Sequence, residues 1–154
     1  MNIKLKTGDL LYRSKGFVEH AGVYLGNDKV IHNKPDGNVE ITHINQYSKG
    51  KTVKVVEVNN CNIEDLKNRL YQLLRSDVRY RLTHQNCEHI ANLLVRGRAY
   101  SPQIRSAIIG ALIAALVASG RSSQYWFFAV VAGGILGCVI TNLAREYDYK
   151  LDLN

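Results

Sequence analysis

Cys87 lies where a thiol could act as a nucleophile. It follows Asn86 at the start of a stretch with helical apolar spacing, NCEHIANLLVR, so we expect it in the first turn of a helix. Unpaired N–H groups and the helix dipole stabilise a thiolate at that position. Ile90 and Leu94 share its helical face, which predicts that the thiol points toward the core. A lone buried cysteine is more often inert packing, so catalysis requires a proton acceptor nearby.

Two histidines in a predicted β-hairpin could supply that acceptor. His20 and His32 lie on either side of the turn sequence Gly-Asn-Asp at residues 26–28, which is flanked by alternating apolar residues. A turn there makes positions whose numbers sum to 52 or 54 face each other, and either register puts both histidines on one face. A slip by one residue would separate them. One histidine could then accept the proton of Cys87 while the other orients it.

Spacing alone leaves other uses of these residues open. The two histidines and Cys87 could bind zinc, but no paired C-x-x-C or H-x-x-x-H spacing supports a metal site. His89 could simply belong to its helix. Cys61 precedes a helix without a nearby histidine and Cys138 lies in an apolar tail, so both look structural. We expect neither a metal nor a cofactor.

The first hundred residues carry strand and helix patterns in mixed order. A turn at Thr7-Gly8-Asp9 precedes a short strand, a second turn at residues 35–37 precedes another, and a β-branched run follows. An amphipathic helix is expected next, with acidic residues in its first turn and an arginine at its end. Residues 1–103 therefore predict a small α+β domain with an antiparallel sheet. The expected elements, besides the hairpin and the cysteine-bearing helix, are strands at Leu10–Tyr12, Val39–Thr42 and Thr52–Val58 and a helix at Ile63–Ser76.

Residues 104–144 predict an apolar helical hairpin. Ala107–Ala118 and Tyr125–Ile140 contain no charged residue and are separated by a polar turn. A membrane span needs about 20 apolar residues. A soluble buried hairpin is the alternative, but so small a domain could hardly cover two such helices. We therefore expect a membrane anchor, which could span the bilayer or lie in it, followed by a short polar tail at residues 145–154.

The excess positive charge precedes this hairpin. Residues 1–105 hold 17 Lys/Arg against 10 Asp/Glu, whereas residues 106–154 hold 3 of each. This balance suits an anionic lipid surface, while the scattered lysines argue against nucleic acid. Charges in the first residues interrupt any signal peptide, so we expect no secretion. Cations flank the hairpin and Arg121 alone lies in its turn, so the positive-inside rule predicts a membrane-associated domain facing the cytoplasm. The flanking cations are Arg96, Arg98, Arg105, Arg145 and Lys150.

Several segments together resemble the lecithin:retinol acyltransferase-like (LRAT-like) family, which includes the mammalian phospholipase A/acyltransferases. The NCEH sequence at residues 86–89 is similar to the family's NCEHF box, and TGDLL at residues 7–11 to its P-G-D-L-I opening. EHAGVYLG at residues 19–26 resembles H-W-A-x-Y-x-G, and VIH at residues 30–32 resembles V-x-H. Arg81–Thr83 and the apolar anchor are also similar. Ala21 and Ile90 depart from the family's Trp and Phe, and the second apolar run exceeds the single anchor of mammalian members.

The resemblance implies a circularly permuted NlpC/P60 (papain-like) domain in which the histidine-bearing sheet precedes the cysteine-bearing helix. It implies that Cys87 is the nucleophile, His20 the general base and His32 the group that orients His20. It further implies a membrane-anchored acyltransferase or phospholipase A that takes an acyl chain from a glycerophospholipid as a thioester. The chain would pass to water, an amine or a hydroxyl, and the acceptor stays open. A cysteine peptidase or amidase on the same fold and a non-catalytic membrane-remodelling or scaffold protein are the alternatives.

Overall fold

The computed structural model describes residues 5–34, 39–75 and 86–153. The chain forms two compact units, which are described separately below. Unit 1 comprises residues 1–14, 20–100 and 146–154, and unit 2 comprises residues 15–19 and 101–145. The turn expected at residues 35–37 and the family-like Arg81–Thr83 lie outside the described residues.

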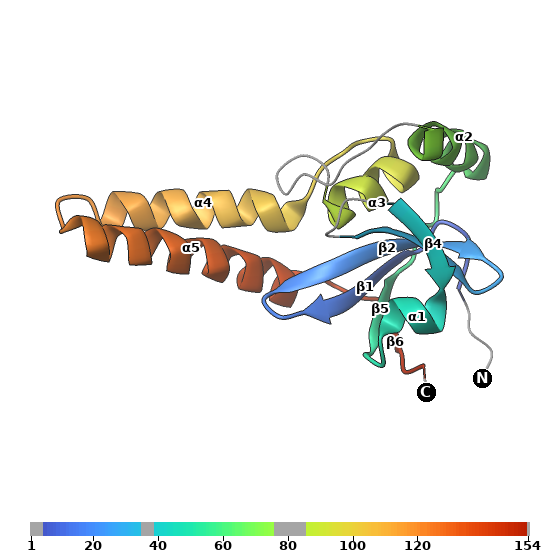
Figure 1. Ribbon diagram of the computed structural model, residues 1–154, viewed down its shortest axis with the longest axis horizontal. Coiled ribbons are helices and arrows are strands. Elements are labelled where there is room, and N and C mark those ends of the chain that lie inside the picture. The colour runs from blue at the N-terminus through green and yellow to red at the C-terminus, as the bar shows by residue number, and fades with distance from the viewer. Residues whose placement is uncertain (1–4, 35–38, 76–85, 154) are drawn as a thin grey trace. The chain divides into compact units, whose positions relative to one another are not determined.

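A six-stranded sheet forms the centre of unit 1 (Figure 1). Its strand order is β4-β3-β2-β1-β5-β6. β3 pairs antiparallel with β2 and β4, and β5 pairs antiparallel with β1 and β6. The predicted strands are all present. The bounds are β1 Leu10–Lys15, β2 Val18–Gly26, β3 Lys29–Asn33, β4 Val39–His43, β5 Val53–Val56 and β6 Tyr149–Leu151.

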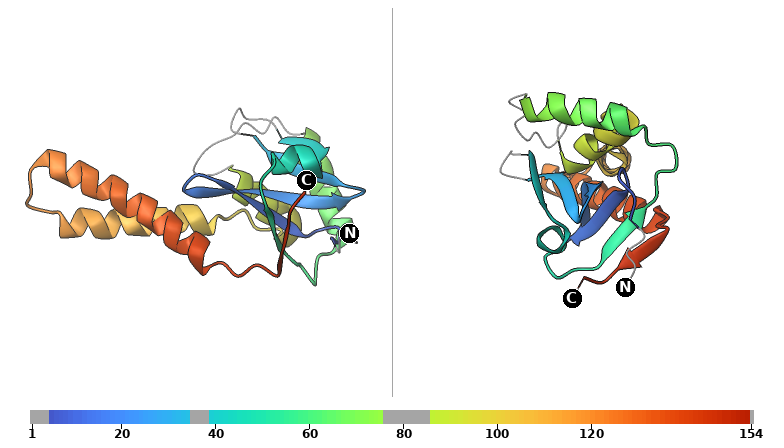
Figure 2. Two further views of the ribbon diagram at one scale, coloured as in Figure 1. Left: turned by 90° about the horizontal axis from the view of Figure 1, so that it is seen from below. Right: turned by 90° about the vertical axis from the view of Figure 1, so that its right-hand side faces the viewer.

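Helices cover both faces of this sheet. α2 (Ile63–Arg75) and α3 (Cys87–Arg96) lie on one side and the short α1 (Ile44–Ser48) lies on the other (Figures 1 and 2). Successive strand residues point to opposite faces, which divides the core into two clusters. The α2/α3 cluster includes Ala21, Val23 and Ile31, and the α1 cluster includes Val30 and Tyr47. The expected α+β class with an antiparallel sheet is confirmed.

The hairpin register agrees with the prediction from the turn. Gly22 pairs with His32, Val23 with Ile31, and Tyr24 with Val30, so facing positions sum to 54. His20 is then the diagonal neighbour of His32 on the same face. Asn27 and Asp28 both have positive φ, of 48° and 56°, as a tight hairpin turn requires.

The helix α3 is capped at both ends by hydrogen bonds. The side chain of Asn86 accepts hydrogen bonds from the N–H groups of Glu88 and His89, each at 2.9 Å. Gly97 closes the helix with φ of 70°, and its N–H donates to the Leu93 carbonyl. From α2, Arg69 Nη1 donates to the Leu94 carbonyl at 3.0 Å, which places a cation at the negative end of the helix dipole.

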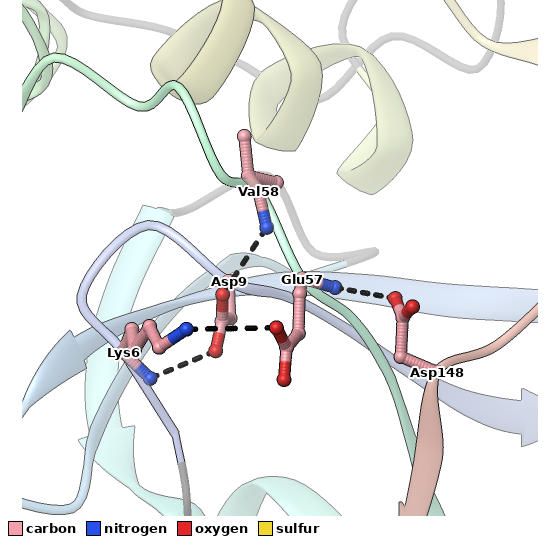
Figure 3. A network of polar contacts seen from close by, with 5 residues as sticks. All are labelled: Lys6, Asp9, Glu57, Val58 and Asp148. Carbon is pink, nitrogen blue, oxygen red and sulfur yellow. Dashed lines mark hydrogen bonds and ion pairs between the residues drawn. The ribbon is translucent and has the colours of Figure 1, made fainter.

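In place of the polar tail expected at residues 145–154, the chain returns to the sheet as β6. Leu151 pairs with Val53, and Tyr149 pairs with Val55. Asp148 accepts a hydrogen bond from the Glu57 N–H at 2.8 Å (Figure 3). The buried Asp9 closes the predicted turn before β1, because its carboxylate accepts from the Lys6 N–H at 2.8 Å and from the Val58 N–H at 3.3 Å (Figure 3).

Unit 2 is dominated by the helices α4 (Pro102–Val117) and α5 (Ser123–Ala144). They pack closely because small residues face each other: a Cβ at Gly133 would lie 2.5 Å from Ala114 Cβ and from the Gly110 carbonyl. Within the described chain, one helix is long and apolar enough to cross a membrane, Gln124–Ala144, with a mean hydropathy of 2.1 and none of its apolar window buried. The large apolar side chains exposed on the two helices include Ile108, Ile109, Leu112, Ile113, Leu116, Val117, Phe127, Phe128, Val131, Ile135, Leu136, Ile140 and Leu143.

Candidate active site

The two predicted histidines meet beneath the surface of unit 1. His20 Nε2 lies 3.2 Å from His32 Nδ1, and the ring centroids are 5.1 Å apart at an interplanar angle of 79°. The side chains are 4% and 7% exposed, so water contributes little to their hydrogen bonding. Neighbouring strands hold them: β2 carries His20, β3 carries His32, and the register between the strands sets their diagonal placement.

β4 contributes two further groups to this pair. Thr42 Oγ1 lies 3.3 Å and Glu40 Oε1 lies 3.4 Å from His32 Nε2. A carboxylate can only accept a hydrogen bond, so it favours the tautomer in which His32 Nε2 carries the proton. His32 Nδ1 is then an acceptor, and His20 Nε2 donates to it. In this tautomer the acceptor nitrogen of the His20 ring is Nδ1.

The charge state of His32 supports this order of donors and acceptors. The pKa of His32 is lowered from 6.5 to about 4, chiefly because the ring is buried; Glu40 opposes this shift and the charge of Arg13 adds to it. His32 is therefore neutral at physiological pH. It can orient His20 by accepting a hydrogen bond, but it does not add a charge to the site.

Tyr47 supports the histidine pair from α1. Its ring stacks on His20 with centroids 5.7 Å apart and is tilted against His32 at 5.3 Å. Its hydroxyl lies 2.8 Å from the His20 carbonyl oxygen and 2.9 Å from that of Leu11, and donates to these backbone acceptors. Gly22 leaves room for the ring, since a Cβ at this position would lie 2.9 Å from Tyr47 Cε2.

Cys87 begins α3, as the sequence predicted. The thiol is half-buried and packs against the α2/α3 cluster, whereas the rings of His20 and His32 contact Tyr47 of the α1 cluster. α3 packs against β3, the strand that carries His32. The pairing of Cys87 with His20 stays a prediction. Cys61 also packs against the α2/α3 cluster, and burial raises the pKa of its thiol.

The sequence-based reasoning missed Glu40 and Tyr47. A signal for Glu40 existed, because a turn centred on residue 36 makes positions that sum to 72 face each other, and His32 does pair with Glu40. No signal in the sequence indicated Tyr47, since a five-residue helix has too little periodicity to reveal a buried face.

Two other features bear on ligands in unit 1. Among the described residues, no group of three or more His, Cys, Asp or Glu side chains is arranged to hold a metal ion. A cavity of about 410 Å³ lies away from the histidine pair. Its lining consists of Glu57, Val58, Asn59, Asn60, Asn62, Asp65, Arg69, Val95 and Arg96, and includes none of the three predicted site residues.

The fold and the buried histidine pair define an α+β protein whose antiparallel sheet carries a candidate acid–base site. Residues 3–100 match the family described as Lecithin retinol acyltransferase. This match covers more than half of the chain, which therefore belongs to that family. It also confirms the resemblance inferred from the sequence motifs.

Curated relatives agree with this assignment. The chain is 28% identical over 134 residues to phospholipase A and acyltransferase 3 of Homo sapiens, covering 72% of this chain and 83% of the relative. It is 28% identical over 126 residues to the Mus musculus protein of the same name, covering 67% and 78%. These matches support acyltransferase or phospholipase activity. The apolar helix α5 could anchor the chain in a membrane.

Proposed function

We propose that the chain is a membrane-anchored thiol acyltransferase or phospholipase A acting on glycerophospholipids. The observation that carries this proposal is the hydrogen-bonded pair of His20 and His32, held in a chain of the Lecithin retinol acyltransferase family. Cys87 is the nucleophile, His20 the general base and His32 the positioning group. The order of histidine strands before cysteine helix is that of a circularly permuted NlpC/P60 (papain-like) domain.

The proposed chemistry has two steps, acylation of Cys87 and transfer of the acyl chain to an acceptor. His20 Nδ1 takes the Cys87 proton, and the thiolate attacks the ester carbonyl of the lipid to form a tetrahedral intermediate. Collapse of this intermediate breaks the ester bond, His20 returns the proton to the departing lysolipid oxygen, and a thioester remains. Water, an amine or a hydroxyl then loses a proton to His20, attacks the thioester and takes the acyl chain. The proton returns to the Cys87 sulfur.

The length of α5 favours a helix that spans the bilayer. Its 22 residues correspond to about 33 Å, close to the hydrocarbon thickness of about 30 Å. Arg121 precedes this helix and Arg145 follows it, with no charged residue between them. Neither helix has the polar face that lying in the interface requires.

The turn between the helices argues against insertion into a single leaflet. Arg121 near the bilayer midplane would cost about 3 kcal/mol or more. Tyr125 and Trp126, the residue types of the interfacial belt, follow within one turn. The turn therefore lies at the far interface. Both ends of the hairpin join unit 1 directly, so the domain and β6 share one side, which the flanking cations make the cytoplasmic side.

Intact mass spectrometry after incubation with phosphatidylcholine vesicles tests the chemistry. The parent chain should gain one fatty-acyl mass, and Cys87→Ser should gain none. Equal acylation of both proteins would remove Cys87 from the mechanism. A parent without an adduct whose Cys87 is still rapidly alkylated by iodoacetamide would turn attention to the peptidase or amidase alternative.

A linker variant tests the anchor. Removing everything after Gly97 would also delete β6, so a Gly/Ser linker should replace residues 106–143 only. The variant should stay in solution when vesicles are sedimented, while the parent should pellet with them. Cosedimentation of both proteins would place the membrane contact in unit 1. A matched variant with Gly134→Ala should pellet like the parent, because a Cβ there meets only ordinary contacts at 3.6 and 3.9 Å.

A further inference from the structure

Unit 2 contains a short turn from the sheet as well as the apolar hairpin. Residues 15–19, the connection between β1 and β2, belong to the same compact unit as residues 101–145. Two side-chain amides fasten this turn to the helices. Asn142 Nδ2 donates to the Phe17 carbonyl at 3.0 Å, and Gln103 binds the backbone of Glu19.

The Gln103 contact has two points of attachment. The Glu19 N–H donates to Gln103 Oε1 at 2.8 Å, and Gln103 Nε2 donates to the Glu19 carbonyl at 3.2 Å. Both residues are 5% exposed, so the two bonds are shielded from water. The amide thus engages both backbone groups of one residue, as a neighbouring strand would, and sets the orientation of its peptide planes.

One of these peptide planes is that of the bond that joins Glu19 to His20. The Glu19 carbonyl and the His20 nitrogen and Cα are coplanar because the peptide bond is planar. On the other side of His20, the Tyr47 hydroxyl lies 2.8 Å from the His20 carbonyl oxygen. The backbone of His20 is therefore fixed before and after the Cα from which the imidazole projects.

We propose that Gln103 is a positioning residue for His20, through which the first turn of the apolar helix α4 sets the geometry of the general base. This inference rests on the base role of His20 in the proposed function. Rotation of the peptide plane before His20 would move the ring away from its 3.2 Å contact with His32 and from the thiol. An error of about 1 Å in such a site costs up to about a hundredfold in rate.

The test compares Gln103→Met, which keeps the volume but removes both hydrogen bonds, with Asn142→Leu, which releases the same turn at Phe17. The full chain is reconstituted in phosphatidylcholine vesicles, and alkylation of Cys87 by iodoacetamide is followed against pH by peptide mass spectrometry. Gln103→Met should lower the alkylation rate at neutral pH about tenfold and move the midpoint toward the ordinary thiol pKa of about 8.5. It should lower kcat with KM unchanged, and hydrogen exchange of the Glu19 amide should accelerate. Asn142→Leu should match the parent.

The proposal would be overturned if Gln103→Met had the same alkylation pH profile and the same kcat as the parent. It would also be overturned if Asn142→Leu lowered the alkylation rate and kcat as much as Gln103→Met does. If Gln103→Met lacks the parental circular dichroism spectrum, Gln103→Asn takes its place, since this amide is too short to reach both groups. If the parent forms no acyl adduct but Gln103→Met still shifts the alkylation profile, the lipid chemistry fails and the positioning role stands. If the parent forms the adduct and Gln103→Met leaves the alkylation profile unchanged, the lipid chemistry stands and the positioning role fails.

Discussion

Acidification should destabilise the folded chain through His32 in particular. The pKa of His32 is about 4 in the folded chain, chiefly because the ring is buried, against 6.5 for an unhindered histidine. Between these values the unfolded chain binds a proton that the folded chain does not bind. The stability present above pH 6.5 is therefore lost as the pH falls toward 4. This interval corresponds to about 3 kcal/mol, at about 1.4 kcal/mol for each pH unit.

Urea unfolding in non-ionic detergent micelles, followed by circular dichroism from pH 7.5 to pH 4, measures this loss. Other groups also titrate in this range, so the parent is compared with His32→Asn, whose amide oxygen takes the place of Nδ1 as acceptor for His20. The variant should be the less stable protein at neutral pH, because it packs less well. The difference in unfolding free energy should shrink by about 3 kcal/mol as the pH falls.

A difference that stays constant over this range would refute the reasoning. His32 would then titrate near its ordinary pKa, and a charged His32 could no longer accept a hydrogen bond from His20. The assignment of His20 Nδ1 as the base nitrogen would lose its support. A direct NMR titration of the His32 ring nitrogens gives the same pKa independently of the unfolding reaction.

Three further predictions concern packing around the site and in the hairpin. Tyr47→Phe removes a buried hydroxyl from two backbone carbonyls and should lower the unfolding free energy by about 1–3 kcal/mol in urea titrations; a loss below about 0.5 kcal/mol would contradict its supporting role. Arg69→Met should cost about 1 kcal/mol in the same assay, because the last carbonyls of α3 lose a cation, and an unchanged midpoint would contradict this. Gly133→Ala should lower the thermal midpoint of the chain in micelles by several degrees, whereas Gly134→Ala should not; equal effects would mean that the close helix contact is absent.

Local signals in the sequence were sufficient to predict most of the helices and strands of unit 1. The hairpin of β2 and β3 followed from alternation and a turn with positive φ, and its register placed His20 beside His32. The start of α3 followed from the helical apolar spacing that begins after Asn86. These features depend on neighbours within a few residues, which is why a single sequence predicts them.

The features that were not predicted depend on distant contacts. β6 has three residues and gains its stability from pairing with β5, about a hundred positions earlier in the chain. α1 is too short to form by itself and exists because Ile44 and Tyr47 are buried. The hydrogen bonds between the Gln103 amide and the Glu19 backbone join residues 84 positions apart, and no periodicity of either segment indicates them.

If the proposed mechanism holds, the surroundings of the histidine pair determine where the thiol proton stays. Arg13 is buried, lies 5.6 Å from the ring of Tyr47, and helps to lower the pKa of His32 to about 4. Passing the proton from His20 on to His32 would charge a ring whose pKa is about 4, which is unfavourable at neutral pH. In the proposed reaction, the proton that leaves Cys87 would therefore stay on His20, next to the leaving oxygen that needs it. A neutral His32 serves this chemistry better than a charged one, because it fixes the tautomer of His20 without competing for the proton.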